Sequence, residues 1–109
     1  MSEHKRFSDW WALLSKTLVP GTTVQHWSAD KGLIPGTFVV HEIEGGYVRV
    51  EGPEDKIYKR MIGAEDFRKV LNVWPDYCRQ IVSRKTVDRK TIHSTYVIGI
   101  IRWLDINSK

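Results

Sequence analysis

The sequence predicts one α+β domain, in which an antiparallel sheet of three to four strands packs against an N-terminal helix and two or three C-terminal helices. Three observations lead to this prediction. Apolar residues recur at helical spacing near both ends of the chain, strand-like segments follow one another in its middle, and a Gly-Gly pair separates two of those segments. With 109 residues, of which 41% are hydrophobic, the chain is long enough to bury a core of its own. We therefore expect a single compact domain over residues 1–109, with residues 1–6 flexible.

The first helix is predicted over residues 8–18. Ser8 can cap its N-terminus, and Asp9 lies in its first turn, where a carboxylate is favoured by the helix dipole. Pro20-Gly21 ends it. Its apolar stripe follows helical spacing and consists of Phe7, Trp10, Trp11, Leu14 and Leu18.

A tight hairpin is predicted around Gly45-Gly46, because the strand-forming segments TFVVHEIE and YVRVE flank this pair. The turn sets the register, and the expected pairs are Ile43–Val48, Glu42–Arg49 and His41–Val50. The expected core face carries Val39, His41, Ile43, Val48 and Val50. The expected solvent face carries Val40, Glu42, Glu44, Tyr47, Arg49 and Glu51.

Two further strands are predicted over residues 22–27 and 56–62, with a loop over residues 28–36 and a turn over Gly52–Asp55. They would complete an antiparallel sheet around the hairpin.

Three helical segments are predicted in the C-terminal half. The first starts near Glu65-Asp66 and ends at Pro75, a short polar helix follows from Ser83, and the last begins at Ser94 or Thr95. The apolar stripe of the last helix is Val97, Ile100, Ile101 and Leu104. Its opposite positions are Gly99, Arg102 and Asp105.

The positive charge of the chain is concentrated in residues 79–102, which hold six basic residues against one acid, Asp88, while the whole chain carries a net charge of +4. Such a cluster attracts polyanions, and nucleic acid is the expected partner. The candidate phosphate contacts are Arg79, Arg84, Lys85, Arg89 and Lys90, with Tyr77 and Tyr96 as candidate stacking partners for bases. The alternative is a solvated charged face, in which Arg84 pairs with Asp88 one helical turn away.

A second hypothesis is catalytic. Pro75-Asp76 followed by Asp88-Arg89-Lys90 resembles the PD…(D/E)xK signature of the restriction-type nuclease superfamily. The resemblance implies that Asp76 and Asp88 bind Mg²⁺ and that Lys90 activates water. In that family these residues lie on adjacent strands, whereas the pattern here predicts a helix end and a polar segment.

The remaining reactive residues predict no metal, cofactor or enzymatic site. His26, His41 and His93 lack metal-ligand spacing, and Cys78 has no cysteine partner. A Cys78–His93 nucleophile pair has nothing in the sequence to activate it. A lone cysteine and the absence of a long apolar run predict a cytoplasmic protein without membrane contact.

Self-association is the third hypothesis. The last helix is apolar on most sides and must be covered on most sides, by other helices or by a second copy of the chain. We expect a homo-oligomer. The candidate partner surface consists of Trp10, Trp11 and Trp103.

The C-terminal third shows a pattern of spaced aromatic and aliphatic residues, namely Trp74, Tyr77, Ser94, Thr95, Tyr96, Ile98, Ile101 and Leu104. This pattern resembles small uncharacterised bacterial proteins carried on mobile integron gene cassettes. The resemblance implies a compact, commonly oligomeric α+β domain and carries over no catalytic residue.

Overall fold

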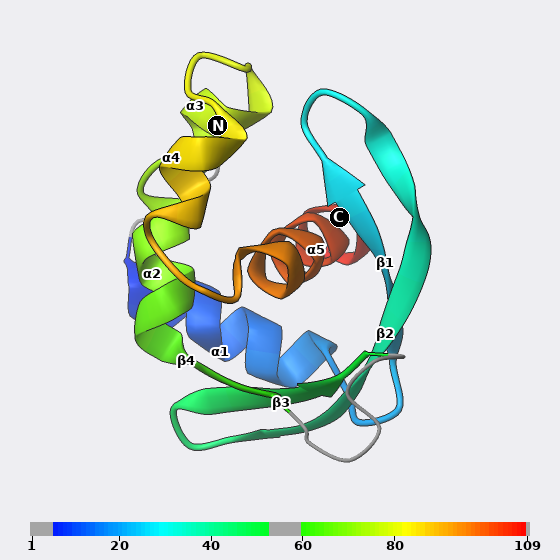
Figure 1. Ribbon diagram of the computed structural model, residues 1–109. Helices are drawn as coiled ribbons and strands as arrows, with labels where there is room; N and C mark the ends of the chain where they lie inside the picture. Colours follow the sequence, from blue (N-terminus) through cyan, green and yellow to red (C-terminus); the bar gives the residue numbers. More distant parts are fainter. Residues whose placement is uncertain (1–5, 53–59, 109) are drawn as a thin grey trace.

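The computed structural model describes residues 6–52 and 60–108. It confirms the predicted α+β class: a helix, a four-stranded antiparallel sheet in the order β1-β2-β3-β4, and then further helices (Figure 1). The elements are α1 (Phe7–Thr17), β1 (Thr23–Ser28), β2 (Gly32–Glu44), β3 (Tyr47–Glu51), β4 (Arg60–Gly63), α2 (Ala64–Leu71), α3 (Trp74–Cys78), α4 (Arg84–Asp88) and α5 (Ser94–Asn107). The predicted flexible N-terminus, most of the turn over Gly52–Asp55 and the first half of the strand over residues 56–62 lie outside the described residues.

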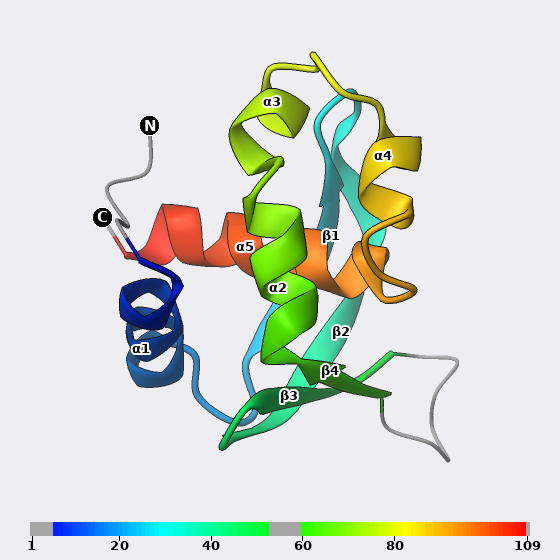
Figure 2. The same cartoon turned by 90° about the vertical axis from the view of Figure 1, so that its left-hand side faces the viewer.

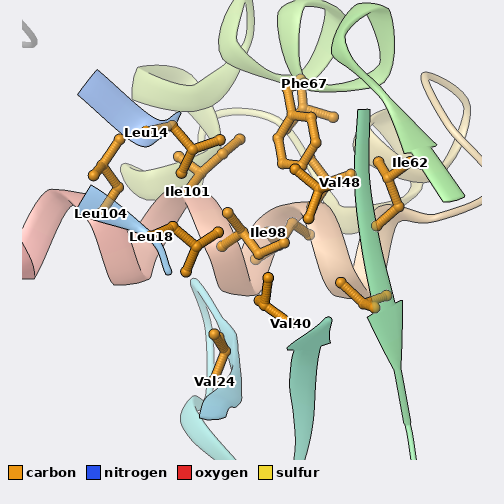
Figure 3. Packing of buried hydrophobic residues seen from close by; sticks show 14 of the residues in the cluster. Leu14, Leu18, Val24, Val40, Val48, Ile62, Phe67, Ile98, Ile101 and Leu104 are labelled. Atoms are coloured by element: carbon orange, nitrogen blue, oxygen red, sulfur yellow. The ribbon is translucent and has the colours of Figure 1, made fainter. Parts of the chain in front are cut away.

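Helix α5 occupies the centre of the molecule. The curved sheet wraps one side of it, while α1 and α2 cover the other side (Figures 1 and 2). Apolar side chains from all these elements meet around it, and the close-up labels Leu14, Leu18, Val24, Val40, Val48, Ile62, Phe67, Ile98, Ile101 and Leu104 (Figure 3). The chain therefore covers the apolar sides of its own last helix.

The N-terminal helix and the first strand lie where the sequence predicted them, but the loop predicted over residues 28–36 is limited to residues 29–31. Strand β2 begins at Gly32, and its pairing with β1 jumps from Gln25↔Thr37 to Trp27↔Leu33. The jump leaves Pro35 in a bulge, where its missing N–H costs no ladder hydrogen bond. Gly36 in the same bulge has φ +115, a backbone conformation that glycine adopts without strain.

A second bulge overturns part of the predicted hairpin faces. The pairs Glu42↔Arg49 and Ile43↔Val48 are confirmed, but Val50 lies opposite Val40 instead of His41, because β2 contains one extra residue at this point. Every β2 residue before the bulge therefore changes face. Val40 and Phe38 are fully buried, Val39 is only half-buried, and His41 is exposed beside Glu51, with 2.5 Å between His41 Nε2 and Glu51 Oε1.

The C-terminal half differs from the prediction at the boundary between α2 and α3. Helix α2 ends at Leu71, and Pro75 lies in the first turn of α3 instead of ending the preceding helix. Proline is favoured there because a first-turn N–H needs no partner within the helix. The short helix after Ser83 and the start of the last helix at Ser94 agree with the sequence prediction.

Gly99 was predicted on the polar side of the last helix and is buried in the core instead. A Cβ atom added at this position would lie 3.1 Å from Phe38 Cε1 and 3.5 Å from Val24 Cγ1. The missing side chain therefore lets α5 pack closely against β1 and β2.

Candidate functional site

The basic segment forms α4 and the connections on either side of it, at the periphery of the molecule (Figure 2). Lys85, Arg89 and Lys90 are exposed, and we call these three residues the α4 cluster. Lys85 and Arg89 are four residues apart on a helical turn, so they lie on one face. Arg79, at the end of α3, is also exposed. Within the described residues, none of these four side chains forms an ion pair.

Arg84 does not belong to this exposed set. Its Nε donates to Asp88 Oδ1 at 2.9 Å, and its Nη2 donates to Thr95 Oγ1 at 2.9 Å. Ser94 Oγ donates to the same Asp88 oxygen at 2.6 Å. The predicted Arg84–Asp88 pair is therefore present, and it fastens α4 to the first turn of α5. It also neutralises the only acid of the segment, so the α4 cluster has no opposing carboxylate in its own segment.

We expect Arg84→Gln to destabilise the domain by about 1 kcal/mol, because it removes charged hydrogen bonds in a network that is only partly shielded from solvent. Lys85→Gln makes the same charge change on the neighbouring residue and should stay within about 0.5 kcal/mol of the wild type. Urea denaturation followed by circular dichroism compares the two. Equal losses for both variants would show that the network does not hold α4.

The two predicted stacking partners are engaged inside the domain. Tyr77 is 3% exposed, its ring packs against Trp27 and Trp74, and its hydroxyl accepts a hydrogen bond from the Ala29 N–H at 3.1 Å. Tyr96 is half-buried with its edge on Phe38. Burial therefore removes Tyr77 from any stacking role, while Tyr96 keeps part of its ring accessible.

The proposed tryptophan surface is also changed by burial. Trp10 is 1% exposed and packs on Phe67, so it is not available to a partner. Trp11 and Trp103 are half-buried, and Trp11 Nε1 donates to Gly45 O at 3.3 Å. The argument for self-association was that α5 needed a second chain to cover it. Elements of the same chain cover α5, so this argument no longer applies and self-association stays a prediction.

Sequence reasoning missed two exposed apolar residues that flank α4. Ile81 is 66% exposed in the connection before it, and Ile92 is 89% exposed in the connection after it. Their only sequence signal is that they are apolar residues within an otherwise polar run.

The nuclease arrangement is not formed by the described elements. Asp76 lies on α3, Asp88 ends α4, and Lys90 follows α4, so none of them is on a strand. Among residues 6–52 and 60–108, no group of three or more His, Cys, Asp or Glu residues could hold a metal ion.

The histidines and Cys78 show no activated nucleophile. His26 packs against the ring of Phe38, and His93 lies just before α5. Although Cys78 is exposed at the surface, partial desolvation of its thiol raises the pKa to about 11, and the Asp105 carboxylate adds to the increase. The thiolate, which is the nucleophilic form, is therefore rare at neutral pH.

A pocket of about 250 Å³ lies between the β1–β2 turn and the α3–α4 connection, which run side by side in Figures 1 and 2. Its lining residues are Ala29, Asp30, Tyr77, Gln80, Val82, Ser83 and Arg84. Two hydrogen bonds join the walls, because Gln80 Nε2 donates to Ala29 O at 3.2 Å and Tyr77 accepts the Ala29 N–H.

Gln80 holds a strained backbone conformation at this pocket. Its φ is +61, and the surrounding bonds, Gln80 N–H to Tyr77 O and Ile81 N–H to Asp76 O, form the Schellman arrangement that ends α3. Glycine is usual at this position, and another residue costs about 1–2 kcal/mol. The side-chain bond to Ala29 explains why glutamine is placed here despite that cost.

The fold and these features define a small α+β domain with a basic helical cluster beside a polar pocket. No protein-family model, curated protein or solved structure matches the chain, so what this site does is argued from its own geometry. In the described part of the chain, no helix has both the length and the apolar character needed to cross a membrane.

Proposed function

We propose that this domain binds a polyanion, nucleic acid first of all, through Arg79 and the α4 cluster. The observation that carries the proposal is the internal pairing of Arg84 with Asp88. This pair neutralises the segment's only acid within α4, while Lys85, Arg89 and Lys90 remain exposed and form no ion pair among the described residues. Cations without a carboxylate partner can bind phosphates by releasing only counterions, because no existing ion pair has to be broken.

The geometry supports contact with the phosphate backbone rather than reading of bases. Helix α4 has only five residues, and α5, the one long helix after it, is buried in the core. Neither is suited to lie in a groove as a recognition helix. Lysine and arginine contacts to phosphates position a nucleic acid but carry no sequence information. The expected binding is therefore independent of sequence and strongly dependent on salt.

The test is fluorescence anisotropy with labelled single- and double-stranded DNA and RNA of mixed sequence at about 50 and 200 mM salt. Four phosphate contacts predict a slope of log K against log salt of about −3.6 for duplex DNA, which is about a hundredfold weakening over that range. The variant Lys85→Gln/Arg89→Gln/Lys90→Gln should lose most of the binding and reduce the slope to about −1. Arg84 is kept because it is structural.

The matched control is Lys16→Gln/Lys31→Gln/Lys69→Gln, which removes the same charge from exposed residues on other elements. It should bind within a few-fold of the wild type. Equal losses in the two triple variants would show that only net charge matters. Absence of wild-type binding at 50 mM salt would reject the proposal and identify the α4 cluster as a solvated face.

A further inference from the structure

We propose that the pocket between the β1–β2 turn and the α3–α4 connection binds a small zwitterion, a molecule with an ammonium and a carboxylate close together, as in a free amino acid. The proposal concerns a small-molecule site and does not depend on polyanion binding. Its volume of about 250 Å³ suits such a ligand, because pockets for drug-sized molecules begin at about 300 Å³.

A carboxylate and a guanidinium line the pocket without pairing with each other, although the guanidinium is paired with Asp88. Asp30 lies on one wall and Arg84 on the other, and no ion pair joins them. Arg84 Nη1 has no acceptor among the described residues, since its Nε and Nη2 bind Asp88, Ser94 and Thr95. A ligand with one group of each sign satisfies both walls at once.

The carboxylate of Asp30 is held in place by the turn that carries it. Ser28 Oγ donates to Asp30 Oδ1 at 2.9 Å and accepts the Lys31 N–H at 3.2 Å. Ser28 itself is only 4% exposed, so this arrangement is anchored in the domain. In the part of the chain that the structure describes, Asp30 Oδ2 receives no hydrogen bond, which leaves it for a ligand ammonium.

The ligand carboxylate needs hydrogen-bond donors, and Tyr77 and Ser83 can provide them. Tyr77 is 97% buried, and its hydroxyl oxygen already accepts the Ala29 N–H. Its own proton has no acceptor within residues 6–52 and 60–108, and a buried donor left unpaired is costly. The exposed Ser83 hydroxyl and Arg84 line the same pocket. Together they supply the donors that a carboxylate needs.

The binding test uses ¹H–¹⁵N correlation spectra of the full chain at up to about 10 mM L-glutamine, L-leucine or L-lysine. We expect saturable shifts confined to residues 28–31 and 77–84 for at least one amino acid. Ethanolamine, which has only the ammonium, and propionate, which has only the carboxylate, should bind at least tenfold more weakly. Equal binding of either half-ligand would overturn the assignment, and so would the absence of shifts with all three amino acids.

Two variants test the named groups. Asp30→Asn and Tyr77→Phe should each weaken binding at least tenfold, whereas Asp76→Asn, a matched change on α3 outside the pocket, should leave it within twofold. Unchanged binding in Asp30→Asn would reject the ammonium contact. Zwitterion binding should also be nearly independent of salt, whereas the affinity for phosphates falls steeply with salt. The two proposals can therefore be confirmed or rejected independently.

Discussion

Val40→Asp should leave the chain without a cooperative folded state, whereas Val39→Asp should fold and lose about 1 kcal/mol. Val40 is fully buried and points into the core between β1 and α5 (Figure 3), while the side chain of Val39 is only half-buried. Burying an unpaired carboxylate costs several kcal/mol, which is comparable with the whole stability of a domain, about 5–15 kcal/mol. The same substitution at adjacent positions therefore separates the two faces of β2.

Thermal and urea denaturation followed by circular dichroism measures this difference. Because Val40→Asp is expected not to fold, Val40→Ala and Val39→Ala form a second pair that remains measurable. The first should lose about 2 kcal/mol and the second less than about 1 kcal/mol. A larger loss at Val39 would mean that β2 pairs with β3 without the bulge at His41, as the hairpin pattern alone predicts.

Gly99→Leu is the second substitution for which we expect a large effect, a loss of about 3 kcal/mol or more. A Cβ atom at residue 99 would already lie 3.1 and 3.3 Å from two atoms of the Phe38 ring, so a full leucine side chain has no space. Either α5 must move away from the sheet or Phe38 must leave its place in the core. Both responses reduce the packing that the central helix makes with β1 and β2.

Gly46→Leu is the matched control for this change. A Cβ at Gly46 would meet no atom within 4 Å, and the backbone there does not require glycine. This variant should stay within about 1 kcal/mol of the wild type. The melting temperature of Gly99→Leu should fall by about 10–20 °C. A fall of only a few degrees would show that α5 is not held tightly against the sheet.

The features that local sequence patterns predicted correctly are those decided by near neighbours. The N-terminal helix follows from the spacing of apolar residues, and the hairpin at Gly45-Gly46 follows from turn chemistry. The Arg84–Asp88 pair follows from a four-residue spacing on a helix. Each of these depends on contacts within one turn of helix or across one tight turn, where the sequence states the partners directly.

Apart from the misplaced helix end at Pro75, which is local, the errors involve partners distant in the chain. The spacing of apolar residues assigned Gly99 to the polar face of the last helix. Glycine has no side chain to indicate burial, so its close approach to Phe38 is visible only in the folded structure. Tyr77 was predicted to stack on bases because it lies next to basic residues in the sequence. In the structure its hydroxyl accepts a hydrogen bond from the Ala29 N–H, 48 positions away. Asp30 and Arg84 are 54 positions apart and line one pocket only because the β1–β2 turn lies beside the α3–α4 connection.

Local patterns along the chain therefore predict the fold class, most of the helices, the hairpin turn and the charge of the α4 segment. Three features depend instead on how distant elements pack: which valine of β2 is buried, which cations remain exposed, and the pocket that Asp30 and Arg84 line together. The physical reason is that spacing along the chain sets local conformation, whereas burial depends on which distant elements cover a residue. A single extra residue in a sheet is enough to exchange its faces.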